Sequence, residues 1–368
     1  MKAKSRVLWL DLSTGKHDVE EIDGRMVVDF IGGRGIASMI VSRDLPSDVD
    51  PLSPENIIAI APGVLVGTIA PTAGRTTIVF KSPATGMFFK TNMGGEWGAE
   101  LRYAGYDLIA LRGKAAHPSY ILITDNMIEM RDASKYWGLD VLETVQQVCK
   151  DAKLPRLSVS CIGPAGERGV KYAAFMSSSS AAGRGGLGAV FGSKNIKAIA
   201  VSGNTPLEVA DVIAFNEECT RVRNAIAVDP RCHYYGNYGT AGGVIGTNEA
   251  NALPSYNFRE GCVADAYSIS GQCLTECGYL VRRESCFACT IACKRHTRTK
   301  ERYLGIETIG PEYESIAALG SCCGVTDMDT ILKANAMCNL YGLDTISTGV
   351  AISWAMECFE KGLIKPSD

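Results

Sequence analysis

The chain has 368 residues, of which 46% are hydrophobic and 21% are charged, a balance typical of a globular protein that buries a large core. This composition excludes a mainly disordered chain. The 37 basic and 40 acidic residues give a net charge of −3, and no tail or face carries one sign, which argues against a dedicated nucleic-acid or membrane-surface binder.

The first 205 residues are predicted to form short strands joined by glycine-rich turns. Most of the apolar runs are short, β-branched or aromatic, and bounded by Gly, Pro, Asp or Asn. One helix, Val141–Lys150, interrupts the strands, because its apolar residues recur three and four positions apart. Asp125 and Asn126 predict a tight hairpin turn. The predicted strands are Val7–Leu12, Ile57–Ile60, Thr76–Phe80, Leu108–Leu111, Tyr120–Thr124, Met127–Arg131, Leu157–Ile162, Lys171–Met176 and Ile196–Val201.

After Gly203 the pattern becomes helical, so we expect a domain boundary near residue 205. Asp327 is a candidate N-cap before an apolar-periodic run, and Gly342 and Gly362 stand where helices often end. Residues 230–305 are rich in Tyr, Gly, Asn and Cys and show little periodicity. The predicted helices are Pro206–Ala227, Glu312–Leu319, Asp327–Leu340 and Gly349–Gly362.

No membrane span or export signal is expected. The longest apolar stretch, residues 57–70, is interrupted by Pro62 and Gly67, whereas a spanning helix needs about 20 apolar residues. The N-terminal residues lack the apolar core of a secretory signal. We therefore expect a cytoplasmic protein, in which clustered cysteines indicate a metal or cluster site rather than disulfides.

The cysteines cluster in the second half of the chain, where all but two of the 14 lie between Cys219 and Cys358. Their sharpest motif is Cys286-x2-Cys289-x3-Cys293. Three thiolates within eight residues can bind one corner of a [4Fe–4S] cluster, which needs four ligands. Two alternatives stay open: a structural zinc site, for which the second Cys-x2-Cys pair is missing, and three buried thiols at helical spacing.

The fourth ligand of such a cluster is not identified by spacing. A distal cysteine on another chain, or on a missing part of this one, could supply it. The candidates within the chain are Cys273, Cys277, Cys322 and Cys323.

A glycine-rich segment, residues 181–192, contains a Gly-x-Gly-x-x-Gly pattern from Gly183 to Gly188. A serine run precedes it and a predicted strand follows too soon, so the strand and long helix of a dinucleotide-binding unit are not expected. The glycines would let backbone N–H groups approach a phosphate, and Arg184 would add charge-assisted hydrogen bonds. The alternative is a turn that packs two sheets together.

Other polar residues at turns are weaker candidates. Arg75 begins a predicted strand, and Asn92 precedes a Gly-Gly turn, so either could face a polar ligand or belong to an ordinary turn. Glu312 and Glu314 lie in Gly310-Pro-Glu-Tyr-Glu. Each could be a solvated carboxylate at a helix start or an acid/base group near a metal.

Together these segments resemble the aldehyde ferredoxin oxidoreductase family of tungsten-pterin enzymes, from one end of the chain to the other. The most specific matches are the cysteine motif, the Gly310-Pro-Glu-Tyr-Glu segment, and residues 339–347. The resemblance implies an α+β fold. An N-terminal double β-sheet domain, residues 1–205, would form the base for a bis-pterin tungsten cofactor, and a mainly helical domain, residues 206–368, would follow.

The resemblance also implies roles for single residues. Arg75 matches an arginine that bridges cluster and pterin, and Glu312 matches a glutamate near tungsten, with Glu314 in the same segment. The cysteines that match three of four ligands of a [4Fe–4S] cluster are Cys286, Cys289 and Cys293. The residues that match contacts of the pterins, or of the Mg²⁺ joining their phosphates, are Asn92, Gly94, Ala181, Gly183, Arg184, Asn339, Leu343 and Asp344.

The implied reaction is the oxidation of an aldehyde to a carboxylic acid at tungsten, with oxygen from water. Electrons would leave one at a time through the cluster to ferredoxin or another electron-carrier subunit. We expect the chain to be a subunit of a homo- or hetero-oligomer.

Some positions depart from the family pattern. Asn339 stands where an aspartate is usual, Ser180 where a basic residue is expected, and Lys333 where some members place a glutamate for a metal between subunits. The sequence ends at Asp368, before the family's third domain. We therefore expect either that a separate chain supplies the rest of the site or that the chain binds cofactor without turnover. A related activity, reduction of an aromatic thioester, is a further alternative.

Overall fold

The computed structural model describes residues 4–365 and 367. Contacts between Cα atoms divide the chain into two compact units. The first unit consists of residues 1–223, 286–289 and 340–343, and the second unit of residues 224–285, 290–339 and 344–368. No helix within the described residues is long and apolar enough to cross a membrane.

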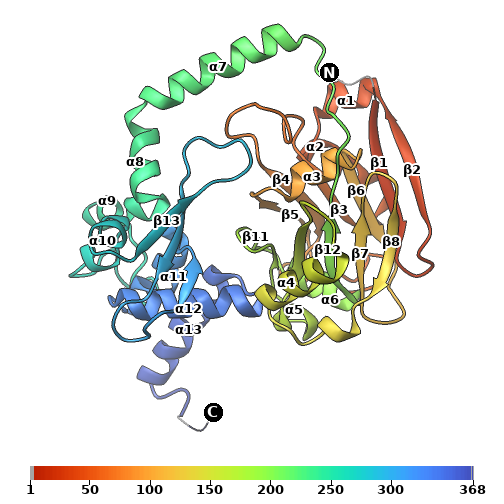
Figure 1. The fold of residues 1–368 in the computed structure, drawn as a ribbon. Helices are drawn as coiled ribbons and strands as arrows, with labels where there is room; N and C mark the ends of the chain where they lie inside the picture. The colour runs from red at the N-terminus through yellow and green to blue at the C-terminus, as the bar shows by residue number, and fades with distance from the viewer. Residues whose placement is uncertain (1–3, 366, 368) are drawn as a thin grey trace. The chain divides into compact units, whose positions relative to one another are not determined.

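The first unit contains two six-stranded sheets (Figure 1). In the first sheet β1 and β6 run parallel and all other neighbours antiparallel; in the second, β7 and β12 are the parallel pair. The first sheet has the order β2 (His17–Asp23), β1 (Lys4–Asp11), β6 (Leu108–Arg112), β3 (Ile58–Pro62), β4 (Thr76–Lys81), β5 (Phe88–Met93). The second has the order β11 (Ala181–Ala182), β10 (Phe175–Met176), β9 (Ser158–Ile162), β12 (Ile196–Val201), β7 (Ser119–Ile123), β8 (Ile128–Asp132).

Side chains of both sheets meet in one hydrophobic core. Ile60 and Phe80 of the first sheet and Ile121 and Phe175 of the second are fully buried in the same cluster. The opposite face of the first sheet is covered by α2 (Arg34–Asp44), and that of the second by α4 (Val141–Ala152). Because the strands of such a pair are buried on both sides, they read as continuous apolar runs. The expected double β-sheet domain and α+β class are confirmed.

The expectation of a single helix among these strands is wrong. The structure adds α1 (Gly24–Phe30), α2, α3 (Trp97–Tyr103), α5 (Pro164–Glu167) and α6 (Leu187–Ser193). Most are two turns or shorter, so their apolar periodicity is hard to see in sequence. Glycines at positions 33 and 186 precede α2 and α6, where a polar N-cap side chain would have signalled a start.

The predicted strands are present, and one of them is shortened. Ile196–Val201 has the predicted bounds, whereas the other strands differ from prediction at one or both ends. Of Lys171–Met176, only Phe175–Met176 forms a strand. The hairpin turn at Asp125 and Asn126 is confirmed, since the Thr124 N–H donates to the Met127 carbonyl at 2.8 Å.

The second unit is mainly helical, with a core in which Ile316 and Ile331 are fully buried. The helix predicted from Pro206 begins only at Val212 as α7 (Val212–Val228), whose residues up to Arg223 belong to the first unit. Asp327 does accept from the Thr330 N–H before α12, and Gly342 and Gly362 follow helix ends with positive φ, as predicted. Its other helices and short turns are α8 (Pro230–Tyr238), η2 (Thr240–Gly242), α9 (Gly243–Glu249), η3 (Tyr267–Ile269), α10 (Gly271–Glu276), α11 (Tyr313–Leu319), η4 (Ser321–Cys323), α12 (Met328–Tyr341) and α13 (Thr345–Glu360).

A small antiparallel sheet, not predicted from sequence, completes the second unit. Its order is β13 (Leu280–Glu284), β14 (Lys294–Arg298), β15 (Glu307–Ile309). The loop between β13 and β14 carries the three cysteines of the motif, so the motif is the connection of a β-hairpin.

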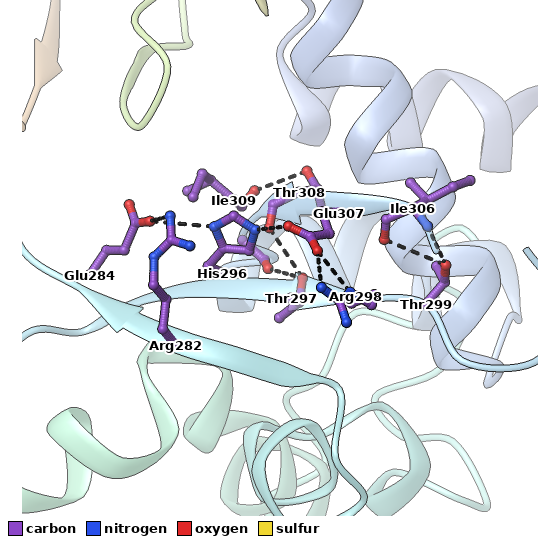
Figure 2. A network of polar contacts seen from close by, with 11 residues as sticks. Arg282, Glu284, His296, Thr297, Arg298, Thr299, Ile306, Glu307, Thr308 and Ile309 are labelled. Carbon is purple, nitrogen blue, oxygen red and sulfur yellow. Dashed lines mark hydrogen bonds and ion pairs between the residues drawn. The ribbon is translucent and has the colours of Figure 1, made fainter. Parts of the chain in front are cut away.

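A polar network crosses this sheet (Figure 2). His296 on β14 lies between two carboxylates, with Nδ1 3.4 Å from Glu284 and Nε2 2.7 Å from Glu307. Arg282 donates to Glu284 at 2.7 Å, and the Nε of Arg298 donates to Glu307 at 2.8 Å. Single exposed ion pairs contribute little, but this set links all three strands beside the cysteine loop.

Lys194, in the first unit, is a fully buried cation whose Nζ donates to the carbonyls of Pro54 (2.8 Å) and Gly113 (3.0 Å). Burial lowers the pKa of Lys194 to about 8. Its charged form is therefore disfavoured in the folded state, and this cost disappears as pH rises from about 8 towards the unfolded pKa of about 10.4. Across that range we expect the free energy of unfolding to rise by up to about 3 kcal/mol relative to Lys194→Met, measured by urea denaturation. Equal pH slopes for both proteins would contradict this.

Candidate cofactor-binding site

The tip of the cysteine loop, residues 286–289, belongs to the first unit and is held there by backbone hydrogen bonds. The Phe287 N–H donates to the Gly95 carbonyl at 3.2 Å. The Thr72 N–H donates to the Ala288 carbonyl at 3.1 Å. Two turns far apart in sequence from the cysteines, one before β4 and one after β5, therefore position the loop tip.

Glycine permits the close approach of these segments. A Cβ on Gly94 would lie 2.6 Å from the Sγ of Cys286, inside any ordinary contact distance. A Cβ on Gly74 would lie 3.2 Å from the Cβ of Cys286 and 3.1 Å from the Phe287 carbonyl oxygen. The Cys286 thiol thus lies directly against the end of β5, and Gly94 is required for its position.

Arg75 directly follows Gly74 in the turn before β4, and it is exposed. Its carbonyl accepts from the Gly63 N–H at 3.1 Å, which fixes the backbone beside Gly74. Among residues 4–365 and 367, no hydrogen bond or ion pair engages its guanidinium group. Five N–H donors and a permanent charge beside the cysteine loop suit an anionic ligand.

Asn92 lies on β5, one strand from Arg75. Its side-chain oxygen accepts from the Thr77 hydroxyl at 2.9 Å, across the β4–β5 pair in which the two residues are partners. Ala181 is exposed at the start of β11, a strand that lies close to β5. The structure therefore brings Arg75, Asn92, Gly94, Ala181 and the loop tip together in the first unit.

The glycine-rich segment follows β11 and leads into α6. A strand of two residues and a helix of seven flank it, so the long elements of a dinucleotide-binding unit are absent, as expected. Two of its glycines have a structural reason: a Cβ on Gly185 would collide with the Phe89 ring, and Gly186 has a φ of +79°. Gly183 and Arg184 precede them, with Arg184 exposed.

In the second unit Glu312 and Glu314 have different surroundings. Glu312 is the N-cap residue of α11, is half-buried, and its carboxylate accepts a hydrogen bond from the Thr240 hydroxyl. The Tyr313 N–H donates to the same hydroxyl oxygen at 3.0 Å, so Thr240 links the carboxylate to the helix start. Glu314 is exposed in the first helical turn, where the helix macrodipole favours a carboxylate.

Asn339, on α12, hydrogen-bonds to strand β15. Its Nδ2 donates to the Thr308 hydroxyl at 3.0 Å and to the Ile309 carbonyl at 2.9 Å. Asn335, one turn earlier, donates to the same two acceptors. Both N–H groups of Asn339 are thus used within the protein, and its side-chain oxygen is the atom left for a ligand.

Leu343 and Asp344 follow α12. Leu343 forms an isolated antiparallel bridge with Ala173 of the first unit, to which residues 340–343 belong. Asp344 is buried and caps α13, accepting from the N–H groups of Ile346 and Ser347 at 3.2 Å each. This capping role is visible in the structure and was not expected from sequence.

All 14 cysteines are free thiols. Cys286 and Cys289 lie in the first unit and Cys293 in the second, all three half-buried. Within the part of the chain that the structure describes, no three His, Cys, Asp or Glu side chains are arranged to hold a single metal ion. Ligands of a [4Fe–4S] cluster bind different iron atoms and need not meet at one point.

Three of the four candidates for a fourth ligand are buried in the second unit, whereas Cys277 is half-buried there. Cys322 and Cys323 are buried, with Sγ atoms near the Ser353 hydroxyl (3.5 Å) and the Gly349 carbonyl (3.4 Å). Cys273 is buried on α10. Burial raises the pKa of Cys323 to about 11 and that of Cys273 to about 12, which disfavours the thiolate that a metal needs.

Two positioning residues were missed by sequence analysis. Thr240 holds Glu312 from 72 positions away, and nothing local signals that contact. Arg295 follows Cys293 by two residues and donates through Nε to its carbonyl at 3.2 Å. The basic pair Lys294–Arg295 directly after the motif was an available signal.

Comparison with known proteins identifies the family. The family model described as "Aldehyde ferredoxin oxidoreductase, N-terminal domain" matches residues 7–203, and that for "domains 2 & 3" matches residues 217–368. The chain belongs to the aldehyde ferredoxin oxidoreductase family. As an aldehyde ferredoxin oxidoreductase family member it falls within a group of oxidoreductases.

The relatives include tungsten enzymes. The chain is 46% identical to a tungsten-containing aldehyde ferredoxin oxidoreductase of Pyrococcus furiosus over 99% of this chain and 60% of the relative. It is 30% identical to an aliphatic sulfonate oxidoreductase, WOR-like subunit, of the same organism, over 99% of this chain and 60% of the relative. The chain thus spans about 60% of the length of the curated relatives it matches.

The solved structures with a similar fold include a benzoyl coenzyme A reductase. It is the BamBC active-site complex of benzoyl coenzyme A reductase with 1,5-dienoyl-CoA. The TM-score is 0.86 and the identity 29%, over 99% of this chain and 57% of that chain.

Proposed function

We propose that this chain takes part in oxidising an aldehyde to a carboxylic acid at a bis-pterin tungsten centre, with electrons leaving through a [4Fe–4S] cluster to ferredoxin. The observation that carries the proposal is the packing of Cys286 against Gly94 and Gly74, the residue before Arg75, whose guanidinium makes no hydrogen bond or ion pair within the described residues. The 46% identity to a tungsten-containing aldehyde ferredoxin oxidoreductase supports the substrate class.

The residues present fit these groups. Gly74 and Gly94 leave space that any side chain would fill, and Arg75 offers free donors to an anion. In the proposed assignment, Cys286, Cys289 and Cys293 hold the cluster. Those that hold the pterins and the Mg²⁺ between their phosphates are Arg75, Asn92, Gly94, Ala181, Gly183, Arg184, Asn339, Leu343 and Asp344.

The tungsten centre, when bound, supplies the two-electron acceptor for the carbonyl carbon. The chain's own residues bind and orient. Arg75, in the turn that packs against the loop tip, supplies a positive charge with directed donors. Glu312, held by Thr240, is proposed to accept the proton from the attacking water. The Thr240 hydroxyl donates to the carboxylate and fixes its direction. Glu314, exposed on the same turn, has no such support.

A second candidate is reduction of an aromatic thioester. The BamBC complex, whose structure covers 99% of this chain, favours it. Because identity to that complex is 29% and identity to the aldehyde enzyme 46%, we rank the aldehyde first. Turnover of simple aldehydes and of an aryl thioester by the same preparation, with a viologen dye as electron partner, separates the two.

Metal content tests the cofactor assignment directly. We would measure metals in anaerobically purified protein together with any chain that co-purifies. One tungsten centre and one cluster predict about one tungsten atom and about four iron atoms per chain. Iron without tungsten would support the cluster alone, whereas zinc without iron would overturn it.

Cys289→Ala is expected to lose most of that iron, because the remaining thiolates cannot hold the cluster. Cys262→Ala is the matched control, since Cys262 is also half-buried and lies outside the motif. Iron content by mass spectrometry and the visible absorbance of the cluster are the measurements. Full iron in Cys289→Ala would contradict the ligand assignment.

A further inference from the structure

Arg295 is a fully buried cation next to the proposed cluster ligands. It is the second residue of β14 and is 1% exposed. Its Nε donates to the Cys293 carbonyl at 3.2 Å, and its Nη2 donates to the Ala292 carbonyl at 2.7 Å. The guanidinium is therefore locked to the last two residues of the cysteine loop.

The other donors of Arg295 reach α8. Its Nη2 also donates to the Gly236 carbonyl at 2.9 Å, and its Nη1 donates to the Asn237 carbonyl at 2.9 Å. A Cβ on Gly239, just after α8, would lie 2.9 Å from the Cys293 carbonyl oxygen, so the packing is close. One side chain thus ties the end of α8 to the cysteine loop, through uncharged carbonyls only.

No carboxylate neutralises this charge at ion-pair distance within the described residues. A second cation, Arg283, donates through Nη1 to the same Gly236 carbonyl at 3.2 Å. Burying a cation without an ionic partner is costly, and an anionic group bound nearby would offset that cost.

We propose that Arg295 is a positioning residue for the [4Fe–4S] cluster, which fixes the Cys293 backbone and raises the reduction potential of the cluster through its buried charge. The inference rests on the proposed function, since it requires Cys293 to be a ligand. Reduction adds one electron and one negative charge to the cluster, and that electron passes on to ferredoxin. A fixed positive charge in a low-dielectric site stabilises the reduced form more than the oxidised one.

The test is the midpoint potential of the cluster, followed by electron paramagnetic resonance in the assembled protein. Arg295→Met removes the positive charge and keeps a long, unbranched apolar side chain. At a fixed ambient potential near the wild-type midpoint, the ratio of reduced to oxidised cluster should fall about tenfold, equivalent to a shift of about −59 mV for a one-electron couple.

Two further variants separate charge from structure. Arg298→Met removes the same charge from the same strand, where Arg298 is 54% exposed and paired with Glu307, and its ratio should stay within about threefold of wild type because solvent screens it. Arg295→Lys keeps a buried charge without the planar fork, so its potential should stay close to wild type even if some iron is lost.

Two results would overturn the role proposed for Arg295. An unchanged potential in iron-loaded Arg295→Met, or a shift in Arg295→Lys as large as that in Arg295→Met, would overturn the proposal. If neither of these Arg295 variants binds iron, Arg295→Gln, which keeps amide donors for the loop carbonyls but carries no charge, takes their place, and a wild-type potential there overturns the proposal. Wild-type protein without iron would instead refute the cluster itself, and with it the proposed function.

Discussion

Glu312→Gln should lower the turnover number for aldehyde oxidation by about 10²–10⁴-fold while leaving tungsten and iron content unchanged. Glutamine keeps the size of the side chain and can still accept the Thr240 hydrogen bond, but it cannot take a proton. Glu312 precedes α11 as its N-cap residue and is half-buried, so its orientation comes from Thr240 and the backbone of the helix start. Dye reduction with a simple aldehyde is the measurement.

The matched control is Glu314→Gln, two positions on. Glu314 is exposed in the first turn of α11, and we expect its variant to retain activity within about threefold. Equal losses in the two variants would indicate a general effect of charge near the helix start. Full activity in Glu312→Gln would remove Glu312 from the proposed chemistry, whatever Glu314 does.

Much of the fold could be predicted from sequence because of how the sheets are buried. Strands such as Ile58–Pro62 and Ile196–Val201 are buried along their whole length, so they appear as short β-branched runs between turn residues. The strand β2 (His17–Asp23) was missed because its exposed, charged residues resemble a loop, and its partner β1 defines it through pairing. Edge strands depend on a neighbour more than on their own pattern.

The candidate site was predictable only where a residue's chemistry is local. Three cysteines at short spacing are recognisable as a motif, and glycines before and after predicted strands indicate turns. The contact between Gly94 and the Cys286 thiol joins segments nearly two hundred positions apart, which no spacing rule reveals. The same holds for Thr240 and Glu312, whose separation of 72 positions hides a direct hydrogen bond.

Some residues predicted as ligand contacts also have structural duties. Asp344 caps α13, and Asn339 secures β15 with both of its N–H groups. A substitution at either position would therefore disturb the fold as well as any cofactor. Arg75 has no such duty within the described residues, which makes it the cleaner position for probing the cofactor.

Gly94→Ala is expected to displace the Cys286 thiol and so to reduce cluster iron by more than half. The added Cβ would lie 2.6 Å from Sγ, and the nearby Ser180 hydroxyl, at 3.7 Å, is not the obstacle. The backbone φ of Gly94 is not in the left-handed region, so alanine is excluded by space alone. Overpacking of this kind costs about 1–3 kcal/mol of folding free energy, which chemical denaturation of metal-free protein would register.

The control substitution is Gly246→Ala on α9, where no atom lies within 4 Å of the added Cβ. Alanine in a helix is favoured over glycine by about 0.5–1 kcal/mol, so this variant should be as stable as wild type or more so, with full iron. If Gly94→Ala also kept about four iron atoms per chain, the content of one cluster, then the Cys286 thiol would not need its observed position against β5. The cluster would then be held independently of the first sheet, and the role given to Arg75 would lose its geometric basis.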